Sequence, residues 1–336
     1  MKKSYYCERL NKTIVFDALK VFFCCATRTG PCVDFSSTNG NVTVNDIKTI
    51  LNRRKKLIQD LSSGNLPAEC VGCFDLKEYA KKKSFLEVLF SQPQKPSTMV
   101  IKHYRQCDCS CVYCSEQNLS KRKIVLKSKK SDYYDLLPIL KELYSKDLLD
   151  SKNLEVLIQG GNSAVLDECD DIIRLLVENK CKKIEMAINA IQYQPIIEEV
   201  CKKTFVDLDI SIDCGSREMF KKIKTVDKFD DVVSNIKRYV KLPIQVRLKY
   251  ILVRGVNDNI EEVAKYIQLM KEIGIKISEL TIDQCDPDFD NGKDFVIPEH
   301  WYKIYDFWEK ECYKNGIYPS LWEYLREILK KGSFFK

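Results

Sequence analysis

Apolar and polar positions follow one pattern from about residue 98 onward, in which short apolar runs alternate with longer stretches of helical periodicity. The apolar runs predict six strands, at 99–104, 154–159, 183–189, 206–213, 245–253 and 279–283. The stretches between them predict helices, which include 132–145, 169–180, 194–203, 229–241 and 260–274. Six such units in a row predict an α/β protein with a parallel sheet, either open or curled into a partial barrel, whose ligands bind at the carboxyl ends of the strands.

The two ends of the chain have a different pattern. Residues 1–95 contain one helical stretch, at 44–61, among turn-rich segments, so this small domain is short of a core and is expected to need a metal to hold it together. The segment at 91–98 has two prolines and no periodicity, which is typical of a linker. Residues 296–336 are helical and aromatic, and we expect them to cover the sheet domain at 96–295.

Composition narrows the function classes. No run of 18 apolar residues occurs, and the two lysines at the start have no apolar segment behind them, so we expect a cytoplasmic protein without a membrane partner. The net charge of +7 is spread along the chain, which gives little support to nucleic-acid binding. Sixteen cysteines stand against two histidines, and in a reducing compartment this ratio favours all-thiolate metal sites over disulfides.

One cysteine group follows the first predicted strand directly. Cys107, Cys111 and Cys114 have the spacing CxxxCxxC, and three thiolates so placed can hold three corners of a 4Fe-4S cluster. The fourth iron is then left for a substrate or cofactor. Cys109 offers a competing CxC register, and a zinc knuckle is the alternative use of the loop.

This arrangement resembles the radical S-adenosylmethionine (SAM) superfamily, whose signature is CxxxCxxC on the loop after the first strand of a partial (β/α)6 barrel. Tyr113 occupies the aromatic position before the last cysteine. The resemblance implies that Cys107, Cys111 and Cys114 ligate the cluster and that Cys109 does not. It also implies that SAM is cleaved to a 5′-deoxyadenosyl radical, which abstracts a hydrogen atom from the substrate.

The second predicted strand ends in a segment similar to the family's Gly-Gly-Glu motif, whose glycines let the backbone approach the SAM amino group. Here the segment is Gly160-Gly161-Asn162. Asn162 replaces the carboxylate, so the resemblance implies a neutral hydrogen bond to the SAM ammonium, about half as strong as a charge-assisted one. Backbone carbonyls are then expected to carry more of this contact.

The fourth and fifth strands supply the other SAM-binding candidates implied by the resemblance. Ser211 and Asp213, on one face by strand alternation, resemble the segment that meets the SAM ribose and carboxylate. Arg247 and Lys249 share a face of the fifth strand and are candidates for the SAM carboxylate. An ordinary strand end that caps the next helix and a solvated lysine at the sheet rim are the alternatives.

The N-terminal cysteines resemble the auxiliary-cluster modules called SPASM or twitch domains, although those modules normally follow the barrel instead of preceding it. A CxxC motif lies at residues 70–73, downstream of earlier single and paired cysteines. The preferred ligands of a second 4Fe-4S cluster are Cys7, Cys24, Cys70 and Cys73. The choice among Cys24, Cys25 and Cys32 stays open, and a structural zinc site is the alternative.

The resemblance leaves the reaction open. It implies a peptide or sugar-like substrate, a reductant such as flavodoxin or ferredoxin, and oxidation, cross-linking or epimerisation as the outcome. Cys285, just past the sixth strand, is a candidate catalytic residue that would give a hydrogen atom to the substrate radical of an epimerase. Cys214 competes for that role, and a packing role is the alternative for both. The alternative function predicted for the whole chain is that of a non-catalytic zinc-binding structural or interaction protein.

Overall fold

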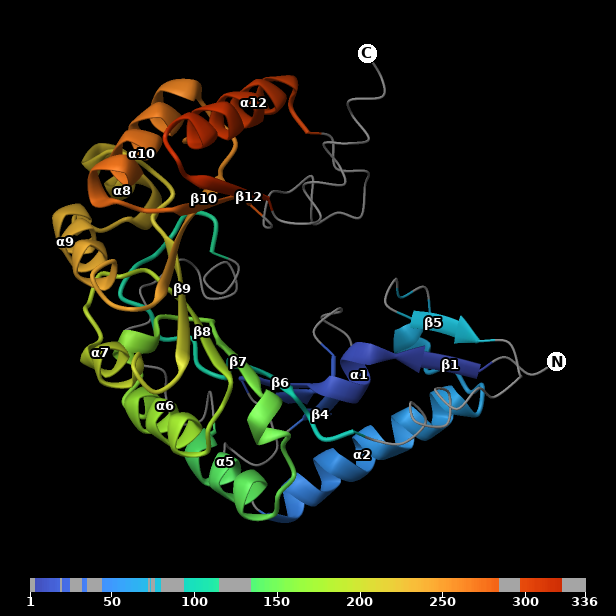
Figure 1. Ribbon diagram of the computed structural model, residues 1–336. Coiled ribbons are helices and arrows are strands. Elements are labelled where there is room, and N and C mark those ends of the chain that lie inside the picture. Colours follow the sequence, from blue (N-terminus) through green and yellow to red (C-terminus); the bar gives the residue numbers. More distant parts are fainter. Residues whose placement is uncertain are drawn as a thin grey trace. The chain divides into compact units, whose positions relative to one another are not determined.

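The computed structural model of the protein (Figure 1) describes residues 4–18, 20–24, 32–34, 44–71, 73, 76–79, 94–114, 134–283 and 297–321. The chain forms two compact units. Unit 1 consists of Met1–Arg105, Lys127–Gly161 and Leu166–Glu185. Unit 2 consists of Gln106–Leu126, Asn162–Val165 and Met186–Lys336.

Unit 1 contains a sheet in which the strands lie in the order β4-β3-β2-β6-β7. β2 (Thr13–Asp17) and β7 (Glu155–Ile158) pair parallel with β6 (Thr98–Lys102), whereas β3 (Lys20–Phe22) and β4 (Cys32–Asp34) continue the sheet antiparallel. The N-terminal strands therefore extend the same sheet as β6, whereas the sequence had suggested a domain boundary near residue 95. Short apolar strands bury their side chains by joining an existing sheet, and this removes the need for a separate core.

A second, two-stranded pairing in unit 1 joins β1 (Ser4–Cys7) to β5 (Leu76–Tyr79) in antiparallel register. The helices described in this unit are α1 (Glu8–Lys12), α2 (Val44–Ser62), α5 (Leu136–Ser145) and α6 (Cys169–Glu178). Its described 3-10 turns are Ala68–Cys70 and Ser151–Asn153. β6 leads into His103, a fully buried side chain whose Nε2 lies 2.7 Å from Glu168 Oε1. This contact fixes the chain just before the first cysteine of the CxxxCxxC motif.

Unit 2 contains four parallel strands in the order β9-β10-β11-β12, at Phe205–Ser211, Gln245–Leu252, Ile277–Ile282 and Tyr318–Leu321. β8 (Lys183–Ile188) begins in unit 1 and ends in unit 2. The helices, with one 3-10 turn, are α7 (Pro195–Val200), α8 (Arg217–Lys224), α9 (Phe229–Tyr239), α10 (Ile260–Ile273), α12 (Glu299–Lys314) and Ser163–Val165. The parallel strands with helices between them confirm the predicted α/β fold.

The two faces of the sheet in unit 2 differ because side chains alternate along each strand. One face is apolar and is covered by helices: Tyr266 of α10 donates to Leu248 O at 2.8 Å, and Trp308 of α12 donates to Ser278 Oγ at 3.1 Å. Figure 1 shows α10 and α12 together above β10 and β12. The other face carries charged residues, so the residues that can bind a polar ligand lie opposite the helices.

The six predicted strands are all present, within about two residues at each end. Two predictions need correction. The C-terminal region is not wholly helical, because Tyr318–Leu321 forms β12 beside β11, and the predicted helical segment from residue 322 onward lies outside the described residues. Helix α8, which is rich in lysine, was not among the predicted helices. Within the described residues, no helix is both long enough and apolar enough to cross a membrane.

Candidate functional site

The CxxxCxxC motif lies in unit 2 on a loop of residues 106–114, which we call the cysteine loop. Backbone hydrogen bonds join this loop to the end of α8: Ser110 N donates to Lys224 O at 3.1 Å and Val112 N donates to Ile223 O at 2.9 Å. Thr225 Oγ1 adds a bond to Ser110 O at 3.0 Å. The loop has no regular secondary structure of its own, so these bonds to α8 set the path of its backbone.

The sulfur atoms of the cysteine loop lie close together. Cys109 Sγ is 3.5 Å from Cys107 Sγ and 3.6 Å from Cys111 Sγ. The hydrogen bond with Cys107 and burial raise the pKa of the Cys109 thiol to about 12. The hydrogen bond with Cys109, together with burial, raises the pKa of Cys111. The loop thus gathers soft sulfur donors, and Cys109 lies among them instead of pointing away, which its position in the motif had not indicated.

A buried ion pair lies beside these thiols. Lys224 and Asp213 are both fully buried and form a salt bridge. Tyr113 joins the pair, since its hydroxyl accepts from Lys224 Nζ at 2.6 Å and donates to Asp213 Oδ2 at 2.5 Å. Burial by itself lowers the pKa of Lys224, but the charges of Asp213, Cys111 and Cys109 and the hydrogen bond to Asp213 together raise the pKa above its usual value, which favours the cationic form of Lys224. The same cation acts electrostatically on the Cys109 and Cys111 thiols.

Asp213 therefore has a different role from the predicted one. Its Oδ1 accepts from Ile251 N at 2.9 Å, while its Oδ2 bonds to Lys224 and Tyr113. Its backbone has a φ of 61°, so strand alternation does not continue from Ser211, and Asp213 turns away from the strand face. Because both oxygens are occupied and the side chain is buried, Asp213 holds Lys224 and the cysteine loop in place instead of facing SAM. Lys224 itself was missed, since it resembles its exposed neighbours in α8.

A second carboxylate, Asp108, lies within the cysteine loop and accepts from three side-chain amides. Asn162 Nδ2 is 3.0 Å and Asn189 Nδ2 is 2.5 Å from Asp108 Oδ1, and Gln192 Nε2 is 3.2 Å from Asp108 Oδ2. Asn189 Nδ2 also lies 3.5 Å from Cys109 Sγ. These contacts connect the cysteine loop to the segments after β7 and β8. Sequence analysis had singled out Asn162 but not Asp108, Asn189 or Gln192.

The glycine pair before Asn162 ends unit 1. Gly160 has a φ of 107°, and a Cβ there would lie 3.0 Å from Tyr104 O, so a side chain is excluded both by conformation and by space. Gly161 N lies 3.5 Å from the same carbonyl oxygen. The described close approach of this glycine pair is to the chain that leaves β6, and the predicted approach to the SAM amino group stays a prediction.

The charged face of the sheet in unit 2 carries Arg247 and Lys249, as predicted. Arg247 lies 3.1 Å from Asp209, 3.2 Å from Glu279 and 3.3 Å from Asp207. Lys249 lies 3.5 Å from Asp209 and from Glu279, and stands in register with Ser211 at the carboxyl end of β9. The face thus alternates acids and bases across three strands. Sequence analysis identified the two cations but not the three acids that surround them.

The N-terminal cysteines come together in unit 1. Cys7 Sγ accepts from Leu10 N at 3.4 Å, at the start of α1. A hydrogen bond with the Cys24 thiol lowers the pKa of Cys7, and the charges of Cys73 and Cys70 raise it. Cys24, Cys70 and Cys73 therefore lie close enough to Cys7 to change its pKa, although the four cysteines are spread over more than sixty residues of sequence.

The other cysteine candidates differ in placement. Cys32 pairs with Phe22 in the sheet and packs against a cluster of Val15, Phe22 and Val100, so its environment is apolar. Cys214 is fully buried, and burial raises its pKa. Cys25 and Cys285 lie outside the described residues. Cys24 is therefore favoured over Cys32 as the ligand after Cys7.

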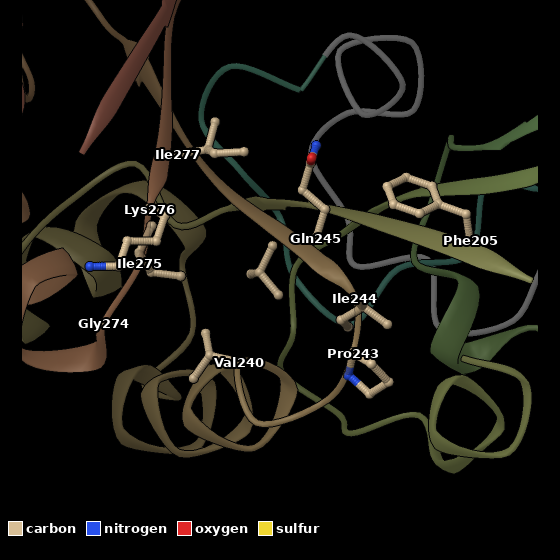
Figure 2. Close-up of a pocket in the computed structure, with 10 residues that line it drawn as sticks. Phe205, Val240, Pro243, Ile244, Gln245, Gly274, Ile275, Lys276 and Ile277 are labelled. Carbon is tan, nitrogen blue, oxygen red and sulfur yellow. The ribbon is translucent and has the colours of Figure 1, made fainter. Parts of the chain in front are cut away.

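A pocket of about 450 Å³ lies at the amino ends of β9, β10 and β11 (Figure 2). Phe205, Ile244 and Ile277 are among its mostly apolar lining residues. The cysteine loop and Lys249 belong instead to the carboxyl ends, where parallel α/β sheets bind their ligands. The pocket is therefore not the reaction site.

Both cysteine groups have the donors that an iron-sulfur cluster needs. The cysteine loop offers clustered thiols beside a buried cation, which offsets the negative charge that thiolates and sulfide bring. The N-terminal group offers four thiols and an N–H donor to sulfur. In the cysteine loop, the described side chains that could hold a metal ion together are Cys107, Asp108 and Cys109, so one carboxylate lies among the thiols and no described histidine does. The thiols of both groups suit iron-sulfur clusters or zinc.

A family model described as the radical SAM superfamily matches residues 101–277, which is more than half of the chain. Among curated proteins, the "Probable GTP 3',8-cyclase" of Saccharolobus islandicus is 24% identical over 187 residues, or 55% of this chain and 56% of that protein. The GTP 3',8-cyclase of Clostridium botulinum is 24% identical over 174 residues. The chain thus spans little more than half the length of these relatives.

Solved structures show the same fold at low identity. SuiB of Streptococcus suis bound to S-adenosylmethionine has a TM-score of 0.51 at 13% identity and covers 68% of this chain and 50% of its own. SuiB bound to its precursor peptide SuiA has a TM-score of 0.51 at 12% identity and covers 81% of this chain and 62% of its own. At this identity the likeness concerns the fold.

Proposed function

Because the chain belongs to the radical SAM superfamily, we propose that it is an enzyme in which Cys107, Cys111 and Cys114 hold a 4Fe-4S cluster. The observation that carries this proposal is that Cys107 and Cys111 each lie within 3.6 Å of the Cys109 sulfur, in a loop beside the buried Lys224. Cys114 is assigned from its place in the motif. When bound, the cluster passes an electron from a reductant such as flavodoxin or ferredoxin into SAM and so produces a 5′-deoxyadenosyl radical. A reducing, cytoplasmic location would keep these thiols reduced.

The residues around the loop have separate tasks in this proposal. Lys224 supplies a fixed positive charge next to the thiolates, and Asp213 with Tyr113 keeps it there. The backbone bonds from Ser110 and Val112 to the end of α8 keep the loop open at the carboxyl ends of the strands. Cys109 is proposed to remain a thiol, because the CxxxCxxC motif of the family assigns the cluster to Cys107, Cys111 and Cys114.

The proposed SAM site lies between the cysteine loop and the strand ends. Asn162 is proposed to present its amide to the ammonium group of SAM, and Gly160 and Gly161 stay candidates from the family resemblance alone. Lys249, aligned with Ser211 at the end of β9, is better placed for the SAM carboxylate than Arg247, which three carboxylates surround. Tyr113 contributes through its backbone, since its hydroxyl is engaged with Lys224 and Asp213.

The proposed substrate is a peptide or a sugar-like molecule. On the described part of the charged sheet face, three carboxylates stand against two cations, and both cations are paired with those carboxylates. Such a face suits hydroxyls, amides or a cationic group. A nucleoside triphosphate, such as the substrate named for the GTP 3',8-cyclases, carries several negative charges and would meet repulsion there. This favours oxidation, cross-linking or epimerisation over nucleotide cyclisation.

A second 4Fe-4S cluster is proposed at Cys7, Cys24, Cys70 and Cys73. The mutual effects of these thiols on the pKa of Cys7 support the set. Four thiolates would saturate the cluster and leave it for electron transfer. In the proposed division of labour, residues 1–95 carry this cluster, residues 96–295 bind and cleave SAM, and residues 296–336 cover the sheet. Cys285 remains the candidate hydrogen-atom donor, since Cys214 is buried.

The test is SAM cleavage by anaerobically reconstituted protein with dithionite as reductant. Wild type should form 5′-deoxyadenosine, and replacement of Cys107, Cys111 and Cys114 by Ala should abolish it. Cys181→Ala with Cys201→Ala, two buried cysteines outside both groups, is the matched control and should keep the activity. Substantial 5′-deoxyadenosine from the triple variant would contradict the proposal.

The rival function is a non-catalytic zinc-binding protein, which the all-cysteine donor sets also permit. The absorption spectrum of the purified protein distinguishes the two functions. Protein purified without oxygen should be brown with broad absorption near ~400 nm if it holds iron-sulfur clusters, whereas zinc has no such transitions. Colourless protein that contains stoichiometric zinc would support the rival.

A further inference from the structure

The carboxylate of Asp108 occupies an unusual place, inside the cysteine loop and directly between Cys107 and Cys109. Its described hydrogen-bond donors are three neutral amides, from Asn162, Asn189 and Gln192. Amide donors stabilise the ionised carboxylate without cancelling its charge. The cysteine loop therefore holds one negative side chain that is fixed in position and still available to attract a cation.

The bond from Asn162 to Asp108 also decides how the amide of Asn162 is oriented. Its Nδ2 points to Asp108 Oδ1 at 3.0 Å, so its Oδ1 faces the other way. Asn162 is 1% exposed, and its Oδ1 has no hydrogen-bond partner among the described residues. A buried acceptor without a donor destabilises the protein, and a ligand that donates a hydrogen bond would remove this penalty.

A second buried acceptor belongs to Gln106, the first residue of the cysteine loop. Gln106 is 7% exposed, and its Oε1 also has no partner in the described part of the chain. The two residues are joined directly, since Asn162 N donates to Gln106 O at 2.6 Å. An unused amide oxygen on a residue that is bonded to a fixed carboxylate matches a ligand group that has N–H donors and a positive charge. A primary ammonium group has both properties.

We infer that Asp108 is a positioning residue for SAM: it orients and polarises Asn162 so that the Asn162 amide oxygen, backed by the Asp108 charge, binds the SAM ammonium. This inference rests on the proposed function, which places SAM at the cysteine loop. Asn162 stands where the family motif has a carboxylate, and in this inference the negative charge comes from Asp108, to which Asn162 is hydrogen-bonded. Asn189 and Gln192 hold the Asp108 carboxylate in register.

The experiment measures binding instead of turnover. Equilibrium dialysis of the reconstituted, iron-loaded protein gives Kd for SAM and for an analogue that has hydrogen in place of the α-ammonium. Wild type should bind SAM about 10- to 100-fold more tightly than the analogue. Asp108→Asn should weaken SAM by about that factor and leave the analogue unchanged, with full iron content. Asp230→Asn, which removes the same charge from a side chain that is 76% exposed on α9, should change neither Kd.

An exchange variant separates charge from structure. Asp108→Asn with Asn162→Asp moves the carboxylate to position 162 and lets the new amide donate to it, so SAM affinity should return to within a few-fold of wild type. This variant also serves if Asp108→Asn alone loses iron.

Several outcomes would overturn the inference. An equal loss of affinity for SAM and for the analogue, an unchanged SAM Kd in Asp108→Asn, or an exchange variant with full iron but no recovery would each contradict it while leaving the proposed function intact. Wild-type protein that holds iron and binds neither nucleotide would contradict the proposed function, and the inference with it.

Discussion

The two cysteine groups have similar donors but are built differently. In the cysteine loop, the thiols lie beside a buried Lys224–Asp213 ion pair, and hydrogen bonds with neighbouring thiols and burial raise the pKa of Cys109 and Cys111. In the N-terminal group, a hydrogen bond with Cys24 lowers the pKa of Cys7, and the Leu10 N–H adds to this effect.

The N-terminal group is supported by a buried guanidinium instead of an ion pair. Arg54 of α2 donates to Leu10 O at 3.0 Å and to Asn11 O, at the end of the short helix that begins at Cys7. Burial lowers the pKa of Arg54 to about 10, so it stays charged near neutral pH. In the cysteine loop the buried cation of Lys224 is paired with a carboxylate, whereas in the N-terminal group the buried cation of Arg54 donates to backbone carbonyls.

The largest expected effect separates the two groups by function. Cys111→Ala with Cys114→Ala should abolish SAM cleavage, whereas Cys70→Ala with Cys73→Ala should retain it but fail to turn over substrate. Each pair should lower the iron content from about eight to about four atoms per chain, as expected for two four-iron clusters. Iron analysis and 5′-deoxyadenosine assays measure this. If wild type and the Cys70→Ala, Cys73→Ala variant both contain about four iron atoms per chain, and wild type also contains zinc that the variant lacks, the N-terminal site is a structural zinc site.

The next largest effect tests the ion pair beside the cysteine loop. Lys224→Met leaves Asp213 buried without its cation, so we expect the free energy of unfolding to fall by about 3–5 kcal/mol. Urea unfolding of the metal-free protein measures it. Lys222→Met, an exposed lysine in the same helix, is the matched control and should cost little. A loss below about 1 kcal/mol for Lys224→Met would show that the loop does not depend on this charge.

A smaller effect is expected in the N-terminal group. Arg54→Met removes the donors to two buried carbonyls at the end of α1, and we expect a loss of about 1–3 kcal/mol together with weaker metal retention at Cys7. Arg53→Met, exposed on the same helix, is the control. Urea unfolding and iron analysis of the two variants provide the comparison. Equal stability of both variants would show that α1 does not need the guanidinium.

The smallest effects concern the cysteines that we do not assign as ligands. Cys109→Ala should keep both clusters and the SAM-cleaving activity, since Cys109 lies outside the CxxxCxxC spacing of Cys107, Cys111 and Cys114. Cys32→Ala should likewise keep about eight iron atoms, because Cys32 packs against apolar side chains. Iron content after reconstitution decides both. Loss of about four atoms in either variant would move that cysteine into the ligand set.

Most of the fold could be predicted from local pattern. The six strands and the helices between them follow from alternating apolar runs, and β10 lies within one residue of its predicted bounds. The prediction failed where pairing partners decide the structure. β12 reads as part of a helical, aromatic tail, yet it forms a strand because the edge of β11 offers backbone hydrogen bonds to it.

Some residues of the candidate site could be predicted from the sequence and others could not. The CxxxCxxC spacing, read with the family resemblance, predicted Cys107, Cys111 and Cys114 as ligands, because the three proposed ligands lie within eight residues of sequence. Asp213 was singled out by its place after a strand, but its role was misjudged, since the left-handed φ that turns it toward Lys224 is not visible in the residue pattern. Asp108 and Lys224 look like ordinary loop and helix charges in the sequence.

The sequence by itself determined the α/β fold, the cysteine loop at the end of the first strand and the excess of thiols over imidazoles, because periodicity and ligand spacing are local properties. The tertiary structure decided which partners meet: Cys7 with Cys24, Cys70 and Cys73, Lys224 with Asp213, and Asp108 with Asn162 and Asn189. These contacts join residues up to 81 positions apart in the last case. Burial and hydrogen bonding at such separations depend on how strands and loops pack, and so they set the charge and orientation of side chains that residue order leaves undefined.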